Sequence, residues 1–311
     1  MEFDNAPERT ICKVAPGWRM NSGRRAPTES DATEPLDDER GYHRRMPEGD
    51  TIFRVAQVLR RALLGSQITR AYAQPRPGLR RVPDLEPLVG SLVVSVEARG
   101  KHLLIGFDNR LTLRTHLRLR GAWHRYRAGE PWRRPASQAS AVLETATSVA
   151  VCFDAPEVEL MTDADVLRHP QLSALGPDLL SRAFEPDEAV RRLASAGTRE
   201  VGEALLDQRL MAGVGNVYKS EICFQEGVDP WRPMASLDED AVAGLVSRAH
   251  RLLGANRTGG ARVTTGEHRP GRELWVYGRA GQPCRRCGTL IEGRRQGEQA
   301  RMTYWCPRCQ T

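Results

Sequence analysis

Four of the seven cysteines in this 311-residue chain form two close pairs near its C-terminal end. Cys284 pairs with Cys287 and Cys306 with Cys309, each in a CxxC pattern, and residues 288–305 separate the pairs. Two such pairs can place four thiolates tetrahedrally around one Zn²⁺ ion. Four thiolates leave no open coordination position, so we predict a structural zinc ion and not a catalytic one.

A second pattern lies in residues 206–218, where Gly213 and Gly215 come directly before Asn216 and a new helical segment. Asparagine is a good helix N-cap, and the first backbone N–H groups of a helix can bind phosphate. The pattern therefore predicts a phosphate-binding helix start at Asn216. An ordinary corner between two helices explains the same residues.

Lys101 follows Gly100 and comes directly before an apolar run. A lysine in such a turn is either a functional cation or an ordinary solvated side chain. His102 and His116 lie near it along the predicted strands. Packed or exposed positions explain both histidines more simply than catalysis does.

The run 115–121 alternates leucine with arginine. On a strand, Leu117 and Leu119 share one face, and Arg118 and Arg120 share the other. Leu119, beside basic neighbours at the end of a loop, could enter a base stack as a wedge. A leucine in the protein core is the simpler interpretation of the residue taken alone.

Helical periodicity begins abruptly at residue 50. The apolar positions follow the i, i+3, i+4, i+7 spacing of one helix face, at Ile52, Val55, Ala56, Leu59, Ala62 and Leu63. Gly65 is placed to end this helix. Residues 1–45 contain few aliphatic side chains and have no period, so we predict a disordered lead-in.

Short β-like runs follow the first helix. They cover residues 92–96, 102–107, 111–119 and 149–153, and turn-forming residues separate them. This spacing favours an antiparallel sandwich or barrel. Cys152 and Cys223 lie in apolar surroundings and are expected to be small buried side chains.

From about residue 165 the pattern is helical. We predict helices at residues 186–196, 201–210, 216–225 and 237–253, a loop over 254–271 and a zinc-ribbon-like hairpin after it. The fold class is α+β with two domains. The expected divisions are a lead-in (1–45), a β-sandwich or barrel domain (46–165), a helical domain (166–270) and a zinc-ribbon-like hairpin (271–311).

The chain is basic, with a formal net charge of +7. Residues 1–45 hold 8 Lys/Arg against 9 Asp/Glu, which leaves 38 against 30 for residues 46–311. A basic folded body favours a polyanionic partner such as nucleic acid. The sequence has no run long enough to span a membrane and no secretory leader, so we expect a cytoplasmic, nucleoid-associated monomer with no membrane partner.

These motifs, taken in order, resemble the bacterial formamidopyrimidine-DNA glycosylase and endonuclease VIII family. The resemblance covers residues 46–311 and includes the segments PEG (47–49), RGK (99–101), LDQ with AGVGN (206–216), VYGR (276–279) and the four-cysteine finger. It implies an N-terminal β-sandwich, a helical domain with a helix–two-turns–helix motif, and a finger that carries zinc. The partner it implies is damaged DNA, with the lesion flipped out of the duplex.

The resemblance also implies roles for single residues. The nitrogen of Pro47 attacks C1′ of the damaged nucleotide, and Glu48 beside it moves protons. Lys101 serves β-elimination and contacts phosphate, and Arg301 serves δ-elimination. In the DNA-binding set, Asn216 binds phosphate, Leu119 fills the gap left by the flipped nucleotide, and Arg118 lies beside this wedge.

Two features resemble the endonuclease VIII branch in particular, namely Gly49 after Pro47-Glu48 and a short loop between residues 260 and 274. Both favour oxidised pyrimidines as substrates, with a formamidopyrimidine or 8-oxoguanine type of glycosylase as the alternative. The chain departs from the family at Asp50-Thr51, where Pro-Glu is usual, and at Arg118 and Arg120. These departures leave the lesion range open.

The lead-in bears directly on the implied chemistry, because the family's proline acts as a free N-terminus. Either Met46 is the true initiator, or a protease removes residues 1–45, or Pro47 stays blocked and the chain binds lesions without excising them. The change of composition at Met46 favours the first account. A zinc-ribbon regulator that reads DNA sequence is a weaker alternative, since it leaves Pro47-Glu48 unexplained.

Overall fold

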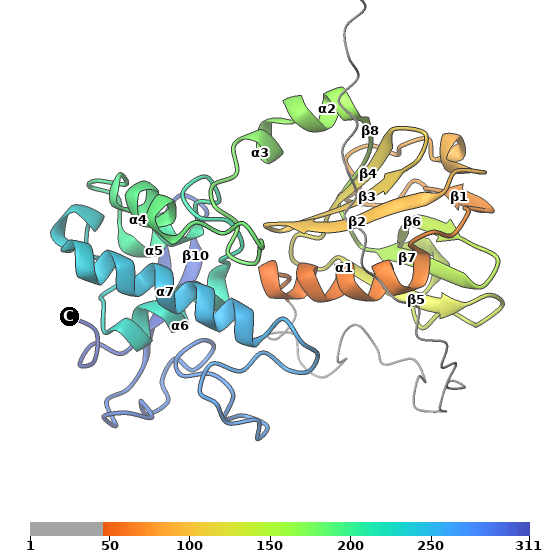
Figure 1. Cartoon of the computed structure of the whole chain (residues 1–311). Helices are drawn as coiled ribbons and strands as arrows, with labels where there is room; N and C mark the ends of the chain where they lie inside the picture. The colour runs from red at the N-terminus through yellow and green to blue at the C-terminus, as the bar shows by residue number, and fades with distance from the viewer. Residues whose placement is uncertain (1–45) are drawn as a thin grey trace, which may run out of the picture. The chain divides into compact units, whose positions relative to one another are not determined.

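The computed structural model describes residues 46–311, drawn in colour in Figure 1. The predicted disorder of residues 1–45, and Cys12 within them, lie outside the described residues. No helix in the described range is long and apolar enough to cross a membrane.

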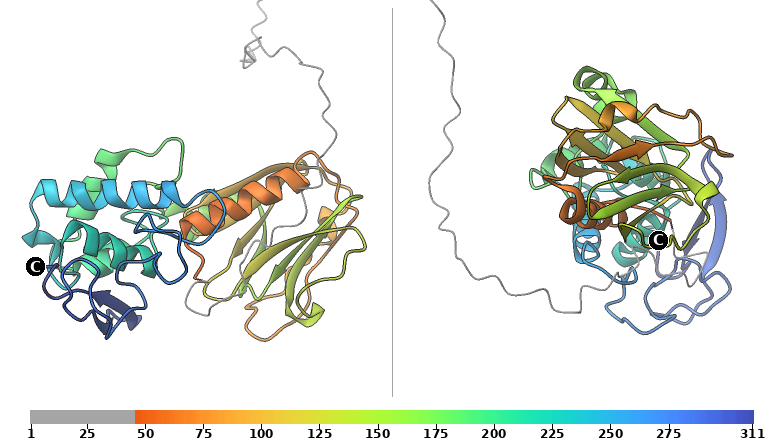
Figure 2. Two further views of the ribbon diagram at one scale, coloured as in Figure 1. Left: turned by 90° about the horizontal axis from the view of Figure 1, so that it is seen from below. Right: turned by 90° about the vertical axis from the view of Figure 1, so that its right-hand side faces the viewer.

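Helix α1 (Gly49–Leu63) opens the described chain and confirms the predicted periodicity. Ile52, Val55, Leu59 and Leu63 on one face are each at most 3% exposed. The helix ends at Leu63, and Gly65 adopts the left-handed backbone conformation (φ +74°) that turns the chain into the first sheet. Figure 2 shows α1 lying along one side of the sandwich.

Two four-stranded antiparallel sheets follow, as the fold prediction requires. One has the order β1-β6-β7-β5, with β1 (Arg70–Tyr72), β5 (Ala122–Arg127), β6 (Ala139–Glu144) and β7 (Ser148–Phe153). The other has the order β2-β3-β4-β8, with β2 (Val93–Arg99), β3 (His102–Phe107), β4 (Leu111–His116) and β8 (Glu157–Thr162). Strands β1, β5, β6 and β8 were not among the predicted runs.

One apolar cluster joins both sheets to α1, which makes the two sheets a sandwich. Ile105 of β3, Trp123 of β5 and Leu59 of α1 are all fully buried in it. Cys152 of β7 is also fully buried there, which confirms its expected role as a small core side chain.

The predicted strand over residues 111–119 is too long. Strand β4 ends at His116, and Arg118 takes a left-handed conformation (φ +52°) in a tight turn. Gly121 closes the turn, donating its N–H to the Leu117 carbonyl at 2.9 Å. The predicted alternation is therefore wrong: Leu117 is 1% exposed, whereas Leu119 is 51% exposed.

The second half is helical. It contains α2 (Asp163–Arg168), α3 (Pro170–Ser173), α4 (Pro186–Ala194), α5 (Val201–Leu206), α6 (Asn216–Glu226) and α7 (Glu239–Ala255). α4, α6 and α7 match predicted helices closely, α5 ends earlier than predicted, and α2 and α3 were not predicted. Helices α4 to α7 share one apolar core, in which Cys223 is fully buried as expected.

After α7 the chain has no helix or strand until β9 (Glu292–Gln296), in agreement with the predicted loop. β9 pairs with β10 (Arg301–Trp305) as an antiparallel hairpin. β10 packs against α6, so the hairpin is seated on the helix that begins at Asn216.

The start of α1 is fixed to the corner that precedes α6. The Gly49 N–H donates to the Gly213 carbonyl at 2.9 Å. A Cβ at Gly49 would lie 2.9 Å from the Gly213 Cα, so this close backbone approach requires glycine. Residues 47 and 48 are thereby placed at the start of α6.

Candidate active site

One cavity of about 790 Å³ is lined by all the residues that the sequence predicted to be catalytic or DNA-binding. These residues come from the start of α1, the β2–β3 turn, the turn after β4, the start of α6 and the start of β10. They are Pro47, Glu48, Lys101, Arg118, Leu119, Asn216 and Arg301. The four predicted metal ligands lie elsewhere.

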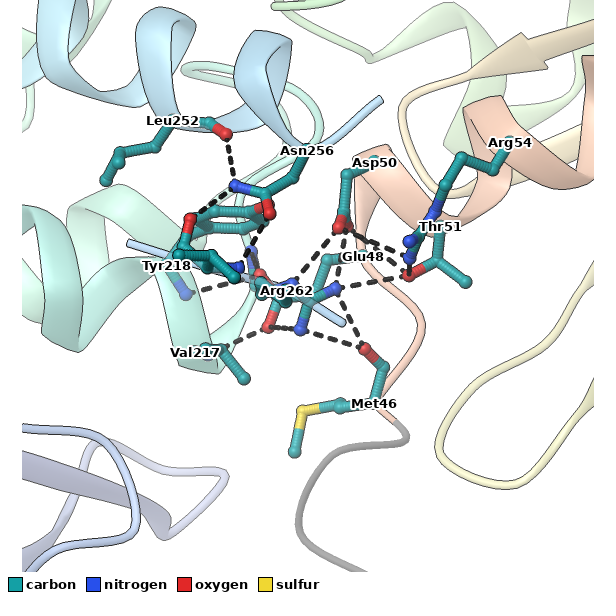
Figure 3. Close-up of polar contacts among 12 residues, drawn as sticks. Met46, Glu48, Asp50, Thr51, Arg54, Val217, Tyr218, Leu252, Asn256 and Arg262 are labelled. Atoms are coloured by element: carbon teal, nitrogen blue, oxygen red, sulfur yellow. Dashed lines mark hydrogen bonds and ion pairs between the residues drawn. The ribbon is translucent and has the colours of Figure 1, made fainter. Parts of the chain in front are cut away.

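Pro47 is buried at the cavity wall and follows Met46 through an ordinary peptide bond. The Met46 carbonyl faces the Arg262 guanidinium, whose Nη1 and Nη2 lie 3.5 and 3.4 Å away (Figure 3). While Met46 is present, the Pro47 nitrogen is an amide and has no basic lone pair.

The Glu48 carboxylate occupies the N-terminus of α6. It accepts the backbone N–H groups of Gly215 (2.8 Å), Val217 (2.8 Å) and Tyr218 (3.3 Å). A negative charge at this end is favoured by the helix dipole. Gly215 leaves room for the carboxylate, since a Cβ there would lie 2.3 Å from the Glu48 Cδ.

This arrangement corrects two expectations about the start of α6. The N-cap residue is Gly215 and not Asn216, which is the first residue of the helix. The N–H groups expected to bind phosphate are already bonded to Glu48. A fully buried carboxylate from a distant segment takes the place that the sequence pattern left open for an anion.

Burial raises the pKa of Glu48, and the nearby cations of Arg262 and Lys101 oppose that rise. The three N–H donors also favour the ionised form. A carboxyl group with a raised pKa can hold or release a proton nearer to neutral pH than an ordinary glutamate.

Arg262, which the sequence analysis missed, pairs with Asp50. Its Nε and Nη2 lie 3.1 and 2.7 Å from the two Asp50 carboxylate oxygens, and Nη2 also donates to Thr51 Oγ1 at 3.1 Å. Burial opposes ionisation of Asp50, but the cations of Arg262 and Arg54 together outweigh it and lower its pKa. The departure at Asp50-Thr51 signalled this pair, but its partner lies more than 200 residues away along the chain.

Lys101 lies in the turn between β2 and β3, half-buried against the cavity. The turn is held by the Gly100 N–H, which donates to Asp178 Oδ2 at 2.7 Å. Burial lowers the pKa of Lys101 to about 8, although Glu48 opposes this shift. Both charge states of this amine are therefore accessible near neutral pH.

His102 and His116 also line the cavity and contact each other edge to face, with ring centroids 4.7 Å apart. Burial lowers the pKa of His102 to about 2 and that of His116 to about 3. Both rings are therefore neutral at physiological pH, in line with the expected packed role. Behind them lies the fully buried Arg114, whose Nη2 lies 2.9 Å from His102 Nδ1 and 3.1 Å from Glu157.

Arg118 and Leu119 occupy the turn after β4. The Arg118 Nε donates to Glu157 Oε1 at 2.8 Å, which holds the guanidinium beside the cavity. Leu119 projects from the turn with half of its surface exposed. An exposed leucine next to a held arginine is suited to contact a partner.

Asn216 and Arg301 connect α6 with the hairpin. Asn216 is 5% exposed, and its Nδ2 donates to the Met302 carbonyl at 2.7 Å. Arg301, the first residue of β10, is partly buried, and its Nε and Nη2 donate to Gln299 Oε1 at 3.3 and 3.2 Å. Its guanidinium has donors left for an anion.

The four predicted metal ligands meet at the base of the hairpin. The sulfur atoms of Cys284, Cys287, Cys306 and Cys309 all lie within 4.8 Å of one another. Tetrahedral coordination with Zn–S bonds of about 2.3 Å separates sulfurs by about 3.8 Å, close to the 4.0 Å and 3.5 Å of two of the pairs. The cluster fits one structural zinc ion, as predicted.

Three family models match the chain in succession. Residues 46–161 match the formamidopyrimidine-DNA glycosylase N-terminal domain, 175–265 the formamidopyrimidine-DNA glycosylase H2TH domain, and 281–311 the zinc finger found in FPG and IleRS. Together they include the sandwich, the helical half and the cysteine cluster.

Curated relatives agree with the models. The chain is 43% identical over 270 residues to the probable endonuclease 8 2 of Streptomyces coelicolor, covering 85% of this chain and 94% of the relative. It is 45% identical to the DNA-(apurinic or apyrimidinic site) lyase Nei2 of Mycolicibacterium smegmatis, covering 86% and 99%. It is 35% identical to endonuclease 8 of Klebsiella pneumoniae, covering 85% and 100%.

Among solved structures, the Lactococcus lactis formamidopyrimidine-DNA glycosylase in complex with AP-site DNA matches with a TM-score of 0.72. The two are 24% identical over 85% of this chain and 99% of the other, so this likeness concerns the fold. The family models and the curated relatives show that the chain belongs to the formamidopyrimidine-DNA glycosylase and endonuclease 8 family. Its class is that of the DNA glycosylases with DNA-(apurinic or apyrimidinic site) lyase activity.

Proposed function

We propose that the chain excises oxidised bases from damaged DNA and then cuts the strand, with the nitrogen of Pro47 as the nucleophile. The main support is that the implied catalytic residues line the same cavity. Pro47, Glu48, Lys101 and Arg301 come from three distant segments and line one cavity, together with the phosphate-binding candidate Asn216. Once Met46 is removed, this set combines an amine, a carboxyl group with a raised pKa and two cations.

The chemistry follows from these groups. The lone pair of a free Pro47 nitrogen attacks C1′, the N-glycosyl bond breaks, and the base leaves with its bonding electrons. The nitrogen gives up its own proton and the leaving base takes up one, so this exchange consumes no net proton. Glu48 donates a proton to the sugar ring oxygen as the C1′–O4′ bond opens, which leaves an iminium between nitrogen and C1′. This Schiff base acidifies the C2′ hydrogens, so loss of one proton expels the 3′ phosphate by β-elimination.

Lys101 and Arg301 act in the elimination steps that follow. Lys101, with a pKa of about 8, can exchange a proton and contact phosphate. Arg301 has free donors for phosphate and assists δ-elimination. Asn216 offers its amide to phosphate, Leu119 fills the space of the flipped nucleotide, and Arg118 supports the turn that carries Leu119.

Oxidised pyrimidines are the favoured substrates. The loop after α7 is drawn together where the N–H groups of Thr264 and Thr265 donate to the Glu273 carbonyl at 2.8 and 3.2 Å. This leaves little chain to cover a purine. Relatives named endonuclease 8 match the chain, in keeping with the branch whose resemblance motivates this choice. An 8-oxoguanine type of glycosylase is the alternative.

The active chain is proposed to begin at Pro47. The match to the N-terminal family model begins at Met46. The alignments with three relatives include 94–100% of each relative but only 85–86% of this chain. If residues 1–46 are instead retained, the same cavity makes the protein a lesion binder that cannot cut.

Borohydride trapping tests this function. The native protein is incubated with duplexes that carry an abasic site, dihydrouracil or 8-oxoguanine, and borohydride is added. We expect a covalent adduct with the abasic and dihydrouracil duplexes and a weaker one with 8-oxoguanine. A stronger adduct with 8-oxoguanine would indicate an 8-oxoguanine type of glycosylase. Tight binding with no adduct would indicate a protein that binds lesions without excising them.

A further inference from the structure

A buried cluster of polar contacts around Arg262 has no role in the chemistry proposed above (Figure 3). Arg262 lies in the loop after α7, and its side chain is 8% exposed. Its planar fork contacts both carboxylate oxygens of Asp50, the Thr51 hydroxyl and the Met46 carbonyl. One guanidinium thus contacts residues on both sides of Pro47.

The same guanidinium is also fixed by contacts behind the cavity-lining Glu48. It stacks over the Tyr218 ring, with its central carbon 4.8 Å from the ring centroid. Its Nη1 lies 3.8 Å from Glu48 Oε1. Arg54 braces the loop from α1 by donating to the Gly260 carbonyl at 2.7 Å. Arg262 is therefore held on several sides and cannot easily turn away.

We propose that Arg262, with Asp50 as its counterion, is a positioning residue for Pro47 and tunes the charge that the proline nitrogen faces. The proposal rests on the proposed function, because it concerns the nitrogen assigned as nucleophile. It also gives a role to Asp50-Thr51, at which this chain departs from the family pattern.

The physical argument starts from the Met46 carbonyl. Its oxygen is two bonds from the Pro47 nitrogen and lies 3.4 and 3.5 Å from the two Arg262 Nη atoms. The guanidinium therefore lies within about 6 Å of that nitrogen. Once Met46 is removed, these donors lose an acceptor and a cation faces the new amine. A cation disfavours the ammonium form, so a larger fraction of the amine is neutral and nucleophilic. Asp50 partly cancels this field.

Other charged and titratable groups also face this region, from every packed element. They are Glu48 directly before α1, Arg54 of α1, Lys101 of the β2–β3 turn, Arg118 of the turn after β4, Tyr218 and Lys219 of α6, Tyr277 before the finger and Arg301 of β10. Arg262 contacts Met46 on one side of Pro47 and Asp50 on the other, so these two charged residues are the ones to substitute.

The experiment measures the single-turnover rate of borohydride trapping on abasic DNA as a function of pH, in chains that begin at Pro47. Arg262→Gln removes the cation, so the acid limb of the profile should move to higher pH by about one unit. Asp50→Asn leaves Arg262 uncompensated, so its acid limb should move to lower pH. Arg262→Lys keeps the charge and should restore the position of the limb with a reduced rate.

Thr51→Val is the matched control, because it removes one hydrogen bond of Arg262 without changing charge. Its acid limb should stay in place. Thermal unfolding shows whether each variant is folded, and if Arg262→Gln does not fold, Asp50→Asn carries the test alone.

Shifts of opposite sign in Arg262→Gln and Asp50→Asn would support the proposal. Rate losses with no displacement of the limb, or shifts of the same sign, would overturn it and leave the pair with a structural role. Absence of any adduct from the unsubstituted chain beginning at Pro47 would instead overturn the proposed function.

Discussion

Glu48 and Glu221 are two fully buried carboxylates that do the same structural work. Glu48 accepts three backbone N–H groups at the start of α6. Glu221, within α6, accepts those of Trp275, Val276 and Tyr277 at 2.8–2.9 Å. Each thereby fixes a segment that is distant in the sequence.

They differ in what surrounds them. Glu48 lines the cavity beside Pro47 and Lys101, whereas Glu221 lies outside it, bonded also to the Thr264 hydroxyl. Burial and bonding to backbone are therefore shared by the carboxylate that we propose to be reactive and by the structural one. Position on the cavity wall does, and the chain offers several further pairs of like residues with one member on that wall or in the metal cluster.

The largest difference is expected between Glu48→Gln and Glu221→Gln. Loss of a positioned general acid should reduce base excision by about 10²–10⁴-fold. Glu221→Gln should lower the melting temperature and leave the rate per folded molecule nearly unchanged. Single-turnover excision and thermal unfolding measure the two effects, and equal rate losses would contradict the distinction.

The cysteines form the next pair. Cys306→Ser removes a zinc ligand and should release the hairpin that carries Arg301, weakening DNA binding and strand cleavage by about 10–100-fold. The sandwich should stay folded. Cys223→Ser, in the buried helical core, should retain zinc and cleavage. Zinc content and cleavage are measured together, and a metal-free Cys306→Ser protein with full binding and cleavage would contradict the assignment.

The two lysines with a lowered pKa differ in the same way. Burial lowers the pKa of both Lys101 and Lys219 to about 8, but only Lys101 lines the cavity, while Lys219 donates to Thr303 Oγ1 at 2.5 Å. Lys101→Met should slow strand cleavage by about tenfold or more. Lys219→Met should leave the cleavage rate of folded protein close to normal.

Lys219 also predicts a pH effect on stability. The pKa of Lys219 is about 8 in the folded protein, whereas the ordinary value for lysine is 10.5. Between these two pH values the unfolded chain binds more protons than the folded one, so the stability of the fold rises with pH. We expect the free energy of unfolding of Lys219→Met, relative to the unsubstituted protein, to fall from pH 7.5 to about pH 10. Denaturant titrations at both pH values check this, and a difference independent of pH would contradict it.

The leucines should show the smallest effect on the reaction. Leu119→Ala should lower excision by about threefold to tenfold through loss of apolar contact with the gap and change stability by less than about 0.5 kcal/mol. Leu117→Ala, which empties a core position, should cost about 2–5 kcal/mol of stability. Denaturant unfolding and excision assays on duplex DNA distinguish them, and an unchanged rate in Leu119→Ala would remove the wedge.

Periodicity predicted the parts of the fold that bury one clean apolar face. Helix α1 was found in this way, and strand β3, which is buried at every position, was found as a continuous apolar run. Strands β5 and β8 carry arginine and glutamate at alternate positions, and their pairing with distant strands decides their structure. The turn at Arg118 was missed since its left-handed backbone is set by tertiary contact and by Gly121.

The residues of the site also differ in whether the sequence could predict them. The four cysteines could be read from spacing, because a metal site needs only ligand type and distance along the chain. The group around Arg262 could not, since Asp50 and Arg262 meet only after α1 docks on the corner before α6. The same docking gives Glu48 the helix start that the sequence alone assigned to a phosphate.

The most direct test of the central claim compares a chain that begins at Pro47 with the chain that begins at Met1. Each is incubated with abasic DNA and borohydride, and any adduct is digested and mapped by mass spectrometry. We expect an adduct on the Pro47 nitrogen in the first chain and none in the second as long as its N-terminus stays intact. An adduct of equal yield in the intact Met1 chain, or one mapped to Lys101, would contradict the assignment of Pro47 as the nucleophile.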